Sequence, residues 1–425
     1  MQFRVIVLLA LRNLRRQLRR SVLTASAMAV GGALLIFSLS VGDGGHEQWI
    51  ESGVRLGNGH VTVEHPEYRV SRRIDHRLPD GVRQAAEAAL GSPDIAPHVV
   101  AASARLSVSA LASSAAGSRP AQIVAVDPSA EAAFGTVDEQ IVEGRYLTVD
   151  DELAAYVGAE LVESLELRIG SRFVVQAQDA EREIAGQLLR VVGIFRSGVS
   201  EVDQTLIHIP LATAGAWLSS GANVTNVGVV LDRSSATARV AGRLERALAE
   251  PVARDNARVM GWREADPALA AAIAIDDFGN YLVQSFLFVI IAFTVVNTVL
   301  MSVMLRRREF GVLQALGLTP GQTGAVVLVE GLTLSVASGL LGVALGLLVT
   351  WGAYGDGLDL SALMGNIDQM TFSGAVVDPV IIPLVTAQRL TQVVVFILCI
   401  GGAASIYPAL RAARIDVTEA LKFDR

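Results

Sequence analysis

Four apolar runs, spaced as one and then three, dominate the pattern of hydrophobic and polar positions along the chain. They cover about residues 21–41, 282–305, 331–355 and 390–410 and contain no charged residue. Each is close to the roughly 20 residues that an α-helix needs to cross the hydrocarbon core of a bilayer. The polar stretch 43–281 is long enough to fold as a domain of its own. The pattern predicts an α-helical membrane protein with four transmembrane helices, arranged as one plus three, and one large inserted domain.

Short alternating and apolar segments within this insert predict a mixed α/β domain. The expected strands are Val61–Glu64, Val99–Ala112, Ala121–Asp127, Arg172–Ala177, Leu188–Phe195 and Asn226–Leu231, and the expected helices are Pro79–Leu90, Glu152–Leu167 and 236–249. Strand–helix pairs occur at both ends and strands dominate the middle. We therefore expect one α/β subdomain built from both ends of the insert and one mostly β subdomain over about 140–215.

The segment that leads into the second apolar run predicts a stiff helical stalk. Arg263–Gln284 contains no proline after Pro267 and few other helix breakers. One helix is therefore expected to continue unbroken into the membrane. The alternative is a flexible juncture at Gly279-Asn280, because both residues have weak helix propensity.

The distribution of charge predicts which side of the membrane each segment faces. Residues 1–42 contain six arginines and no acid, whereas 43–281 contain 33 acids and 21 arginines. Arginines also follow the second and fourth apolar runs, and the positive-inside rule then places both termini in the cytoplasm. The predicted order is a cytoplasmic segment (1–20), a transmembrane helix (21–42), an extracytoplasmic domain (43–281), a transmembrane helix (282–305), a cytoplasmic helical loop (306–322), a transmembrane helix (323–353), an extracytoplasmic loop (354–389), a transmembrane helix (390–410) and a cytoplasmic tail (411–425).

A cleaved signal peptide is the alternative interpretation of the first run. Its small-residue triplet Ala25-Ser26-Ala27 resembles a cleavage site but falls too early, since apolar sequence continues to Val41. An uncleaved signal-anchor helix fits the length better.

The 306–322 loop carries the densest local signal. Phe310, Leu313 and Leu316 recur at i, i+3 spacing and predict a short amphipathic helix with an apolar edge exposed at the cytoplasmic surface. Such an edge suits either a membrane-surface helix or a docking ridge for a partner. Thr319-Pro320 and Gln322 form a capping box with proline at the first helical position, so a new helix should begin there.

Residue patterns that would support chemistry in this chain are missing from its sequence. The histidines at 46, 60, 65, 76, 98 and 208 lack metal-ligand spacing, Cys399 is the sole cysteine, and no Gly-x-Ser-x-Gly elbow occurs. Lys422 is the sole lysine, and no Gly-x-x-x-x-Gly-Lys-Ser/Thr motif precedes it. We expect no catalytic, cofactor or metal site, no ATP-binding P-loop and no nucleic-acid partner.

Several motifs resemble one family of membrane proteins. The loop sequence Arg307-Arg308-Glu309-Phe310-Gly311-Val312-Leu313-Gln314-Ala315-Leu316-Gly317, then Glu330, and the ending Tyr407–Leu421 are similar to the two signatures of FtsX-like ABC permeases. Ala10–Leu14, Glu143–Leu147 and Val192–Phe195 also match this family. Within it, Gly57–Val63 and Trp262–Leu269 are most similar to the lipoprotein-releasing permeases, followed by the MacB-type exporters.

This resemblance implies a function and its partners. Glu309, Phe310, Gly311, Leu313, Ala315, Leu316 and Gly317 would form a coupling helix seated on a dimer of separate ATPase subunits, which bind ATP and Mg²⁺. The chain would pair with a second copy or a paralogue in the bacterial inner membrane, and its MacB-like periplasmic core domain would move when ATP binds. The substrate would be a lipoprotein or another hydrophobic molecule, with a periplasmic chaperone or adaptor as a further partner. The alternatives are MacB-like efflux of drugs or peptides and FtsX-like regulation of a cell-wall hydrolase.

Four residues of this membrane region have more than one interpretation. Glu309 pairs either with the ATPase or with Arg306 or Arg308 of its own segment. Glu330 lies either at the membrane interface or inside the helix bundle, where it would tie helices together. Gly342 and Gly346 form a small-x-x-x-small pair that predicts close helix packing, within one subunit or between two.

Overall fold

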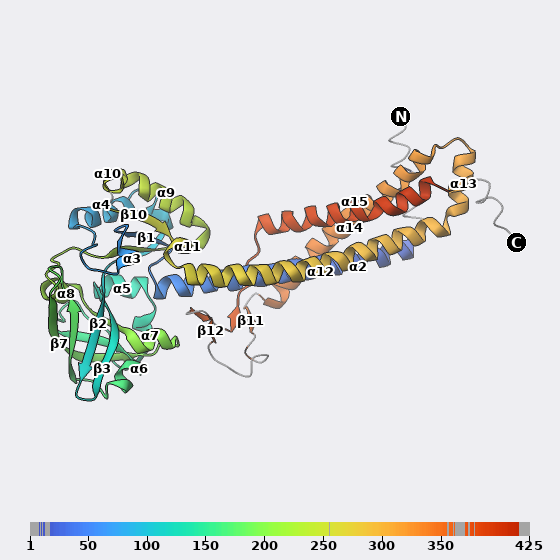
Figure 1. Ribbon diagram of the computed structural model, residues 1–425. Coiled ribbons are helices and arrows are strands. Elements are labelled where there is room, and N and C mark those ends of the chain that lie inside the picture. Colours follow the sequence, from blue (N-terminus) through green and yellow to red (C-terminus); the bar gives the residue numbers. More distant parts are fainter. Residues whose placement is uncertain are drawn as a thin grey trace. The chain divides into compact units, whose positions relative to one another are not determined.

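The computed structural model describes most of the chain as two compact units (Figure 1). The described residues are 8, 10, 12, 18–254, 256–354, 357–359, 361, 370–372, 375–377 and 379–415. One unit holds the described parts of 1–45, 275–362 and 380–415, and the other holds 46–274 and the described parts of 363–379. Most of the predicted cytoplasmic segment 1–20 and the motif residues 416–421 lie outside the described residues, as do the remaining residues of the C-terminal tail.

Within the described residues, four helices are long and apolar enough to cross a membrane. They are α2 (Leu18–Leu56), α12 (Pro267–Leu305), α14 (Pro320–Tyr354) and α15 (Ala387–Ala413), and the short α13 (Arg307–Ala315) lies between α12 and α14. A shared apolar core joins all five helices, including Leu35, Val295, Phe310, Val327 and Ile397.

Small residues bring α14 and α15 together, and the two helices run side by side in Figure 1. A methyl group at Gly331 would overlap the Ser405 side chain, and one at Gly401 would overlap the Ser335 side chain. This reciprocal pairing of glycine with serine lets the two backbones approach closely. We did not predict this contact, although its small residues recur at four-residue spacing in the sequence.

The helices α2 and α12 are each longer than a membrane span. Each has 39 residues, which corresponds to about 58 Å at 1.5 Å per residue, against about 30 Å for the hydrocarbon core. The predicted unbroken helix into the second run is therefore confirmed, and the flexible juncture at Gly279-Asn280 is wrong. The continuation of α2 to Leu56 was not predicted, because Gly42, Gly44 and Gly45 disfavour helix.

Tertiary packing explains why α2 continues through these glycines. A methyl group at Gly44 would collide with the backbone of Ile382, so the missing side chain permits a close approach. Further along, Ile50 and Val54 of α2 pack on Leu269 and Ile273 of α12 in a separate apolar cluster. Burial of this cluster outweighs the weak helix propensity of the glycines. The C-terminal end of α2 is therefore paired with the N-terminal end of α12.

The second unit is built on one ten-stranded sheet among its described residues, in the order β10-β1-β9-β2-β3-β8-β5-β7-β4, with β6 pairing to β2 and β7. The strands are β1 (Val61–Glu64), β2 (Val99–Ser114), β3 (Gly117–Val126), β4 (Ile141–Gly144), β5 (Ala154–Gly158), β6 (Arg172–Gln178), β7 (Ile184–Phe195), β8 (Leu206–Pro210), β9 (Asn226–Leu231) and β10 (Arg258–Gly261). The helices are α3 (Tyr68–Ser71), α4 (Asp80–Leu90), α5 (Pro128–Phe134), α6 (Ala159–Ser164), α7 (Ser200–Thr205), α8 (Leu211–Trp217), α9 (Thr237–Ala247), α10 (Ala249–Ala253) and α11 (Trp262–Ala265). The predicted mixed α/β domain is confirmed.

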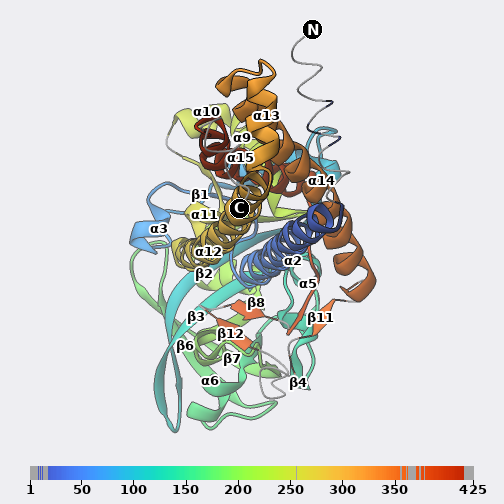
Figure 2. The same cartoon turned by 90° about the vertical axis from the view of Figure 1, so that its right-hand side faces the viewer.

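The long strand β2 belongs to two subdomains. Its first half, Val99–Arg105, pairs with β9 in the α/β half, whose core also holds residues of α4 and α9. Its second half, Leu106–Ser114, pairs with β3 as a long hairpin, seen in Figure 2, and with β6. The α/β subdomain is therefore built from both ends of the insert, as predicted, but the β-rich subdomain begins within β2 rather than near residue 140.

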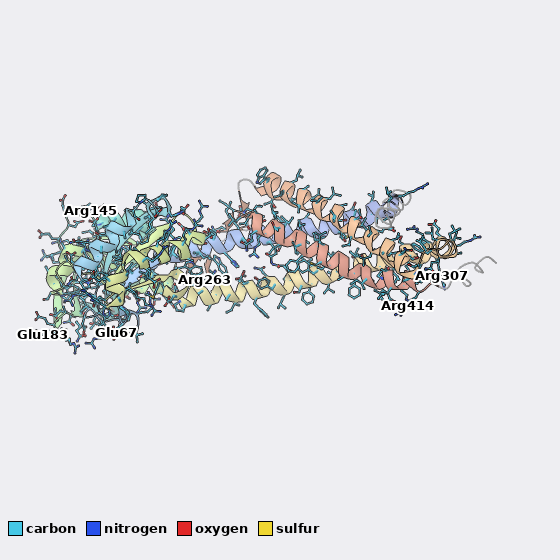
Figure 3. All side chains as sticks on the ribbon, turned by 90° about the horizontal axis from the view of Figure 1, so that it is seen from above. Glu67, Arg145, Glu183, Arg263, Arg307 and Arg414 are labelled. Atoms are coloured by element: carbon cyan, nitrogen blue, oxygen red, sulfur yellow. The ribbon has the colours of Figure 1, made fainter. Side chains whose placement is uncertain are left out.

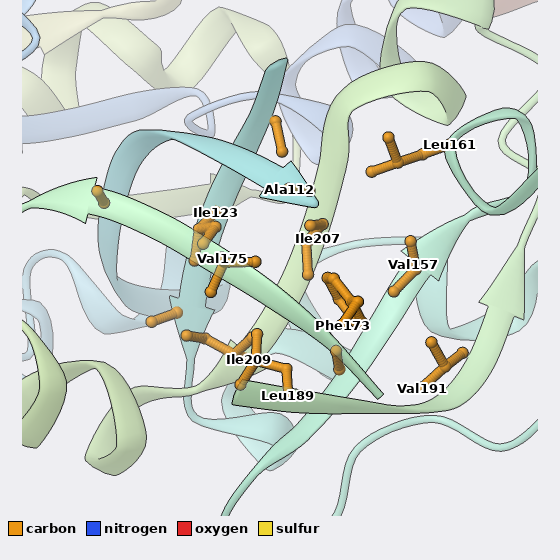
Figure 4. Close-up of a cluster of buried hydrophobic side chains, with 14 of the residues drawn as sticks. Ala112, Ile123, Val157, Leu161, Phe173, Val175, Leu189, Val191, Ile207 and Ile209 are labelled. Atoms are coloured by element: carbon orange, nitrogen blue, oxygen red, sulfur yellow. The ribbon is translucent and has the colours of Figure 1, made fainter. Parts of the chain in front are cut away.

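The β-rich subdomain is a closed barrel in the described part of the chain. The strands β2, β3, β8, β5, β7 and β6 pair in turn, and β6 returns to β2. Figure 4 shows the apolar side chains that fill its interior, among them Ile123, Phe173 and Ile207. A barrel this small is packed with side chains and leaves no channel.

One predicted helix of this subdomain is wrong. The first part of Glu152–Leu167 forms β5, every residue of which is buried between β7 and β8, and only Ala159–Ser164 is helical. A short apolar run cannot be assigned to strand or helix by its periodicity, so the neighbouring strands decide its conformation.

The predicted loop 354–389 contains two short antiparallel pairs among its described residues. They join β11 (Leu358–Asp359) to β14 (Val380–Ile381) and β12 (Met370–Phe372) to β13 (Ala375–Val377).

Candidate functional site

The short helix α13 lies between the end of α12 at Leu305 and the start of α14 at Pro320. At its far end, the Thr319 N–H donates to Oε1 of Gln322 at 2.9 Å, and the Gln322 N–H donates to Oγ1 of Thr319 at 3.3 Å. This reciprocal pair is the predicted capping box, and α14 begins at Pro320. The capping box fixes where the chain turns back after α13.

One side of α13 is packed into the bundle core. Phe310 is only 1% exposed and contacts residues of the shared apolar core, and Gly311 is also buried. Leu313 is half-buried against the same core. The prediction that Phe310 lies on an exposed apolar edge is wrong, because its ring anchors α13 to the other helices.

The opposite side of α13 presents a different set of residues to the surroundings. Leu316 is 79% exposed, and Glu309, Val312, Ala315 and Gly317 are exposed as well. We call these five residues, of which Leu316 and Gly317 directly follow the helix, the outer face of α13. Val312 was missed in the sequence, because the i, i+3 spacing favoured Phe310 and Leu313.

The Arg306 guanidinium connects α13 to α14. Its Nε lies 3.0 Å from Oε2 of Glu309, and its Nη1 lies 3.1 Å from Oε2 of Glu330. The same guanidinium lies over the Phe310 ring, 4.9 Å from its centroid. Glu309 thus makes the predicted pair with Arg306, and Glu330 forms an ion pair within the helix bundle.

The glycine pair of α14 lies against α2 of the same chain. A methyl group at Gly342 would lie 3.0 Å from the carbonyl oxygen of Ala29, and one at Gly346 would lie 2.9 Å from Cβ of Ile36. Side chains at these positions would force the two helices apart.

A second ion pair ties α2 to the start of α15. Arg389 donates through Nη2 to Oδ1 of Asp43 at 2.7 Å and through Nε to Oδ2 at 2.8 Å, which is bidentate geometry. Nearby, the Leu384 N–H donates to the Ser40 carbonyl at 2.8 Å. The sequence contains no local sign of this pair, because its members are 346 positions apart.

The second unit, which contains the ten-stranded sheet, holds a buried polar network at the junction of its two subdomains. Arg105 of β2 forms an ion pair with Glu131 of α5, donates to the Gly57 carbonyl that follows α2, and stacks over Phe134. Burial alone would raise the pKa of Glu131, but the Arg105 charge lowers that pKa overall. The network therefore holds an ionised pair where the end of α2 meets the sheet.

His208 of β8 lies close enough to this network for the charges of Glu131 and Arg105 to act on its imidazole. Its Nδ1 lies 3.2 Å from the Tyr146 hydroxyl, and burial lowers the pKa of His208 to about 4. At neutral pH the imidazole is uncharged and accepts or donates a hydrogen bond according to its tautomer. In the ranges that the structure describes, no group of three or more His, Cys, Asp or Glu residues is placed to hold a metal ion.

Two family models match the two parts of the chain. Residues 21–247 match the MacB-like periplasmic core domain, and residues 281–417 match the FtsX-like permease C-terminal. The first match alone covers more than half of the sequence, and the second covers α12 from residue 281 together with α13, α14 and α15.

Similar proteins carry related names. The lipoprotein-releasing system transmembrane protein LolC of Neisseria meningitidis is 22% identical over 338 residues, which cover 77% of this chain and 79% of that protein. LolC of Xylella fastidiosa is 24% identical over 318 residues, covering 72% and 74%. Among solved structures, the periplasmic region of MacB from Actinobacillus actinomycetemcomitans is 14% identical with a TM-score of 0.35 and covers 50% of this chain and 93% of that one. The chain belongs to the FtsX-like and MacB-like family of ABC transporter permeases.

Proposed function

We propose that this chain is the membrane subunit of an ABC complex that releases lipoproteins from the bacterial inner membrane toward the outer membrane. The observation that carries the proposal is the similarity to proteins named as lipoprotein-releasing, over 77% of this chain and 79% of the Neisseria protein. ATP and Mg²⁺ would be bound by a separate ATPase dimer, because the sequence lacks a P-loop motif. A second copy of the chain or a paralogue would complete the membrane part, and a periplasmic chaperone would accept the lipoprotein.

The proposed topology has four membrane spans with both termini and α13 in the cytoplasm. Arg307 and Arg414 lie at the same end of the helices in Figure 3. The arginines that follow the second and fourth apolar runs of the sequence belong to this end. The positive-inside rule supports a cytoplasmic position for this end. The domain between α2 and α12 is then periplasmic.

The outer face of α13 is the proposed docking surface for the ATPase. It offers an exposed leucine and valine beside the charged Glu309, a combination that suits insertion into a groove of a partner. Phe310 and Leu313 support α13 from behind. The long helices α2 and α12 would carry motion of the ATPase to the periplasmic domain, since each is unbroken.

The test is lipoprotein release by the purified complex. The full chain would be purified with its co-purifying ATPase, reconstituted in vesicles with a fluorescent lipoprotein, and given ATP and a soluble periplasmic extract. We expect ATP-dependent transfer of the lipoprotein into the soluble fraction. Transfer that is absent in the presence of ATP hydrolysis would contradict the proposal, and activation of a cell-wall hydrolase or export of a drug would then identify one of the two alternatives.

A further inference from the structure

Arg306 occupies the break between two helices, and its side chain is buried. Residue 306 lies between the last residue of α12 and the first of α13, and its carbonyl accepts from the Phe310 N–H at 3.1 Å. The side chain is only 6% exposed. A buried arginine must be paired, because it remains charged at every physiological pH.

The two carboxylates that contact this guanidinium are not equivalent. The Glu330 side chain is 14% exposed, whereas that of Glu309 is 48% exposed. Water screens the Glu309 pair, so that pair contributes little to holding the helices. The Glu330 pair is shielded, and it joins the start of α13 to a position 24 residues further along the chain, within α14.

From this geometry we propose that Arg306 is the positioning residue that locks α13 to α14, so that movement of the docked ATPase reaches α14 through the Arg306–Glu330 pair. The inference rests on the proposed docking of an ATPase at α13. It assigns Arg306 a role in transmitting motion and assigns binding to the outer face of α13.

Binding and transmission are separable because the apolar docking residues are not members of the Arg306–Glu330 pair. Arg306 is buried, and Leu316 at the other end of α13 is 79% exposed. Loss of Arg306 would remove one contact of Glu309 and would leave the exposed side chains of Val312 and Leu316 unchanged. It would also leave Glu330 without this buried partner, and α13 could then shift relative to α14.

The experiment compares binding with coupling in the full chain, reconstituted in nanodiscs with its ATPase. Arg306→Gln and Glu330→Gln each remove one charge, and the double variant removes both. Two quantities are measured: the Kd for the ATPase subunit, and the stimulation of ATP hydrolysis by the permease. Arg411→Gln is the matched control, since it removes an exposed arginine of α15.

We expect both single variants to bind the ATPase within about twofold of the wild-type Kd and to lose most of the stimulation of hydrolysis, by roughly tenfold or more. The double variant should lose no more of the stimulation than either single variant, because each single change already breaks the same contact between α13 and α14. Arg411→Gln should behave as wild type. If Arg306→Gln does not fold, Glu330→Gln tests the same pair, because glutamine retains the size of the side chain.

Two results would overturn the inference. One is a loss of ATPase binding in the single variants as large as that caused by changing the outer face of α13, and the other is wild-type stimulation in both. Failure of the proposed function is distinguishable, since it would appear as an absence of ATPase binding, or of lipoprotein release, in the wild-type complex itself.

Discussion

The outer face of α13 makes a quantitative prediction about ATPase binding, centred on Leu316. Its side chain is 79% exposed in the free chain and would be covered by a docked partner. Full burial of a leucine contributes about 1.5–3 kcal/mol, so this exposed fraction corresponds to about 2 kcal/mol. Each 1.4 kcal/mol changes a dissociation constant tenfold, so Leu316→Ser should weaken ATPase binding roughly 30-fold.

The assay is a titration of the ATPase subunit onto the full chain in nanodiscs, followed by fluorescence anisotropy. Leu410→Ser is the matched control, because Leu410 is 52% exposed and lies near the end of α15. The control should bind as wild type, and the thermal unfolding midpoint of Leu316→Ser should be unchanged because the side chain supports no core. An unchanged Kd in Leu316→Ser would refute the assignment of this face to the ATPase.

Three further predictions concern the packing and electrostatics of the fold. The pKa of His208 is lowered to about 4 in the folded chain. The unfolded state therefore takes up the proton first as the pH falls, and the folded state should lose about 2 kcal/mol of stability between pH 7.5 and 5. The thermal midpoint should therefore fall more steeply with acidification in the wild type than in His208→Asn, and parallel slopes would count against this origin. Gly346→Leu should lower the thermal midpoint of the full chain, since overpacking costs about 1–3 kcal/mol. Gly352→Leu is the control and should not lower it, because nothing lies within 4 Å of the added carbon. Equal midpoints would disprove the close approach of α14 to α2. A double-mutant cycle with Asp43→Asn and Arg389→Gln should give a coupling energy of about 1 kcal/mol for this partly exposed pair, and strictly additive effects would show that the ion pair does not stabilise the fold.

The correction at α13 shows how a short helix can mislead a sequence argument. Apolar residues occupy positions 310, 312, 313, 315 and 316, so the segment has apolar side chains on more than one face. Spacing alone placed Phe310, Leu313 and Leu316 on one exposed edge. The bundle buries Phe310 and partly buries Leu313, because the aromatic ring fills the shared core, whereas Leu316 is exposed as predicted and Val312 is exposed as well.

This packing decides which substitutions can test docking. Substitutions such as Gly311→Asp or Leu313→Asp would place a charge in or beside the core and would disturb the bundle as well as any docking. Changes at Val312 or Leu316 report on docking without that disturbance.

Features that depend on neighbouring residues were readable from the amino-acid order. The lengths of the apolar runs, the capping box at Thr319 and Gln322, most strands of the outer domain and the long helix α12 all follow from local pattern. They are local because hydrogen bonds within a helix or turn join residues a few positions apart. The motifs that point to the permease family belong to the same class of signal.

Features that join distant positions required the folded chain. Four contacts join segments that are remote in sequence. They are the Arg306–Glu330 pair, the contact of Gly346 with α2, the bidentate pair of Asp43 with Arg389, and the closure of the barrel from β6 back to β2. The continuation of α2 through its glycines is of the same kind, because burial against other segments overrides the helix propensity of the residues themselves. That packing also decides which residues are exposed to a partner, since a side chain can dock only when the core of its own chain does not cover it.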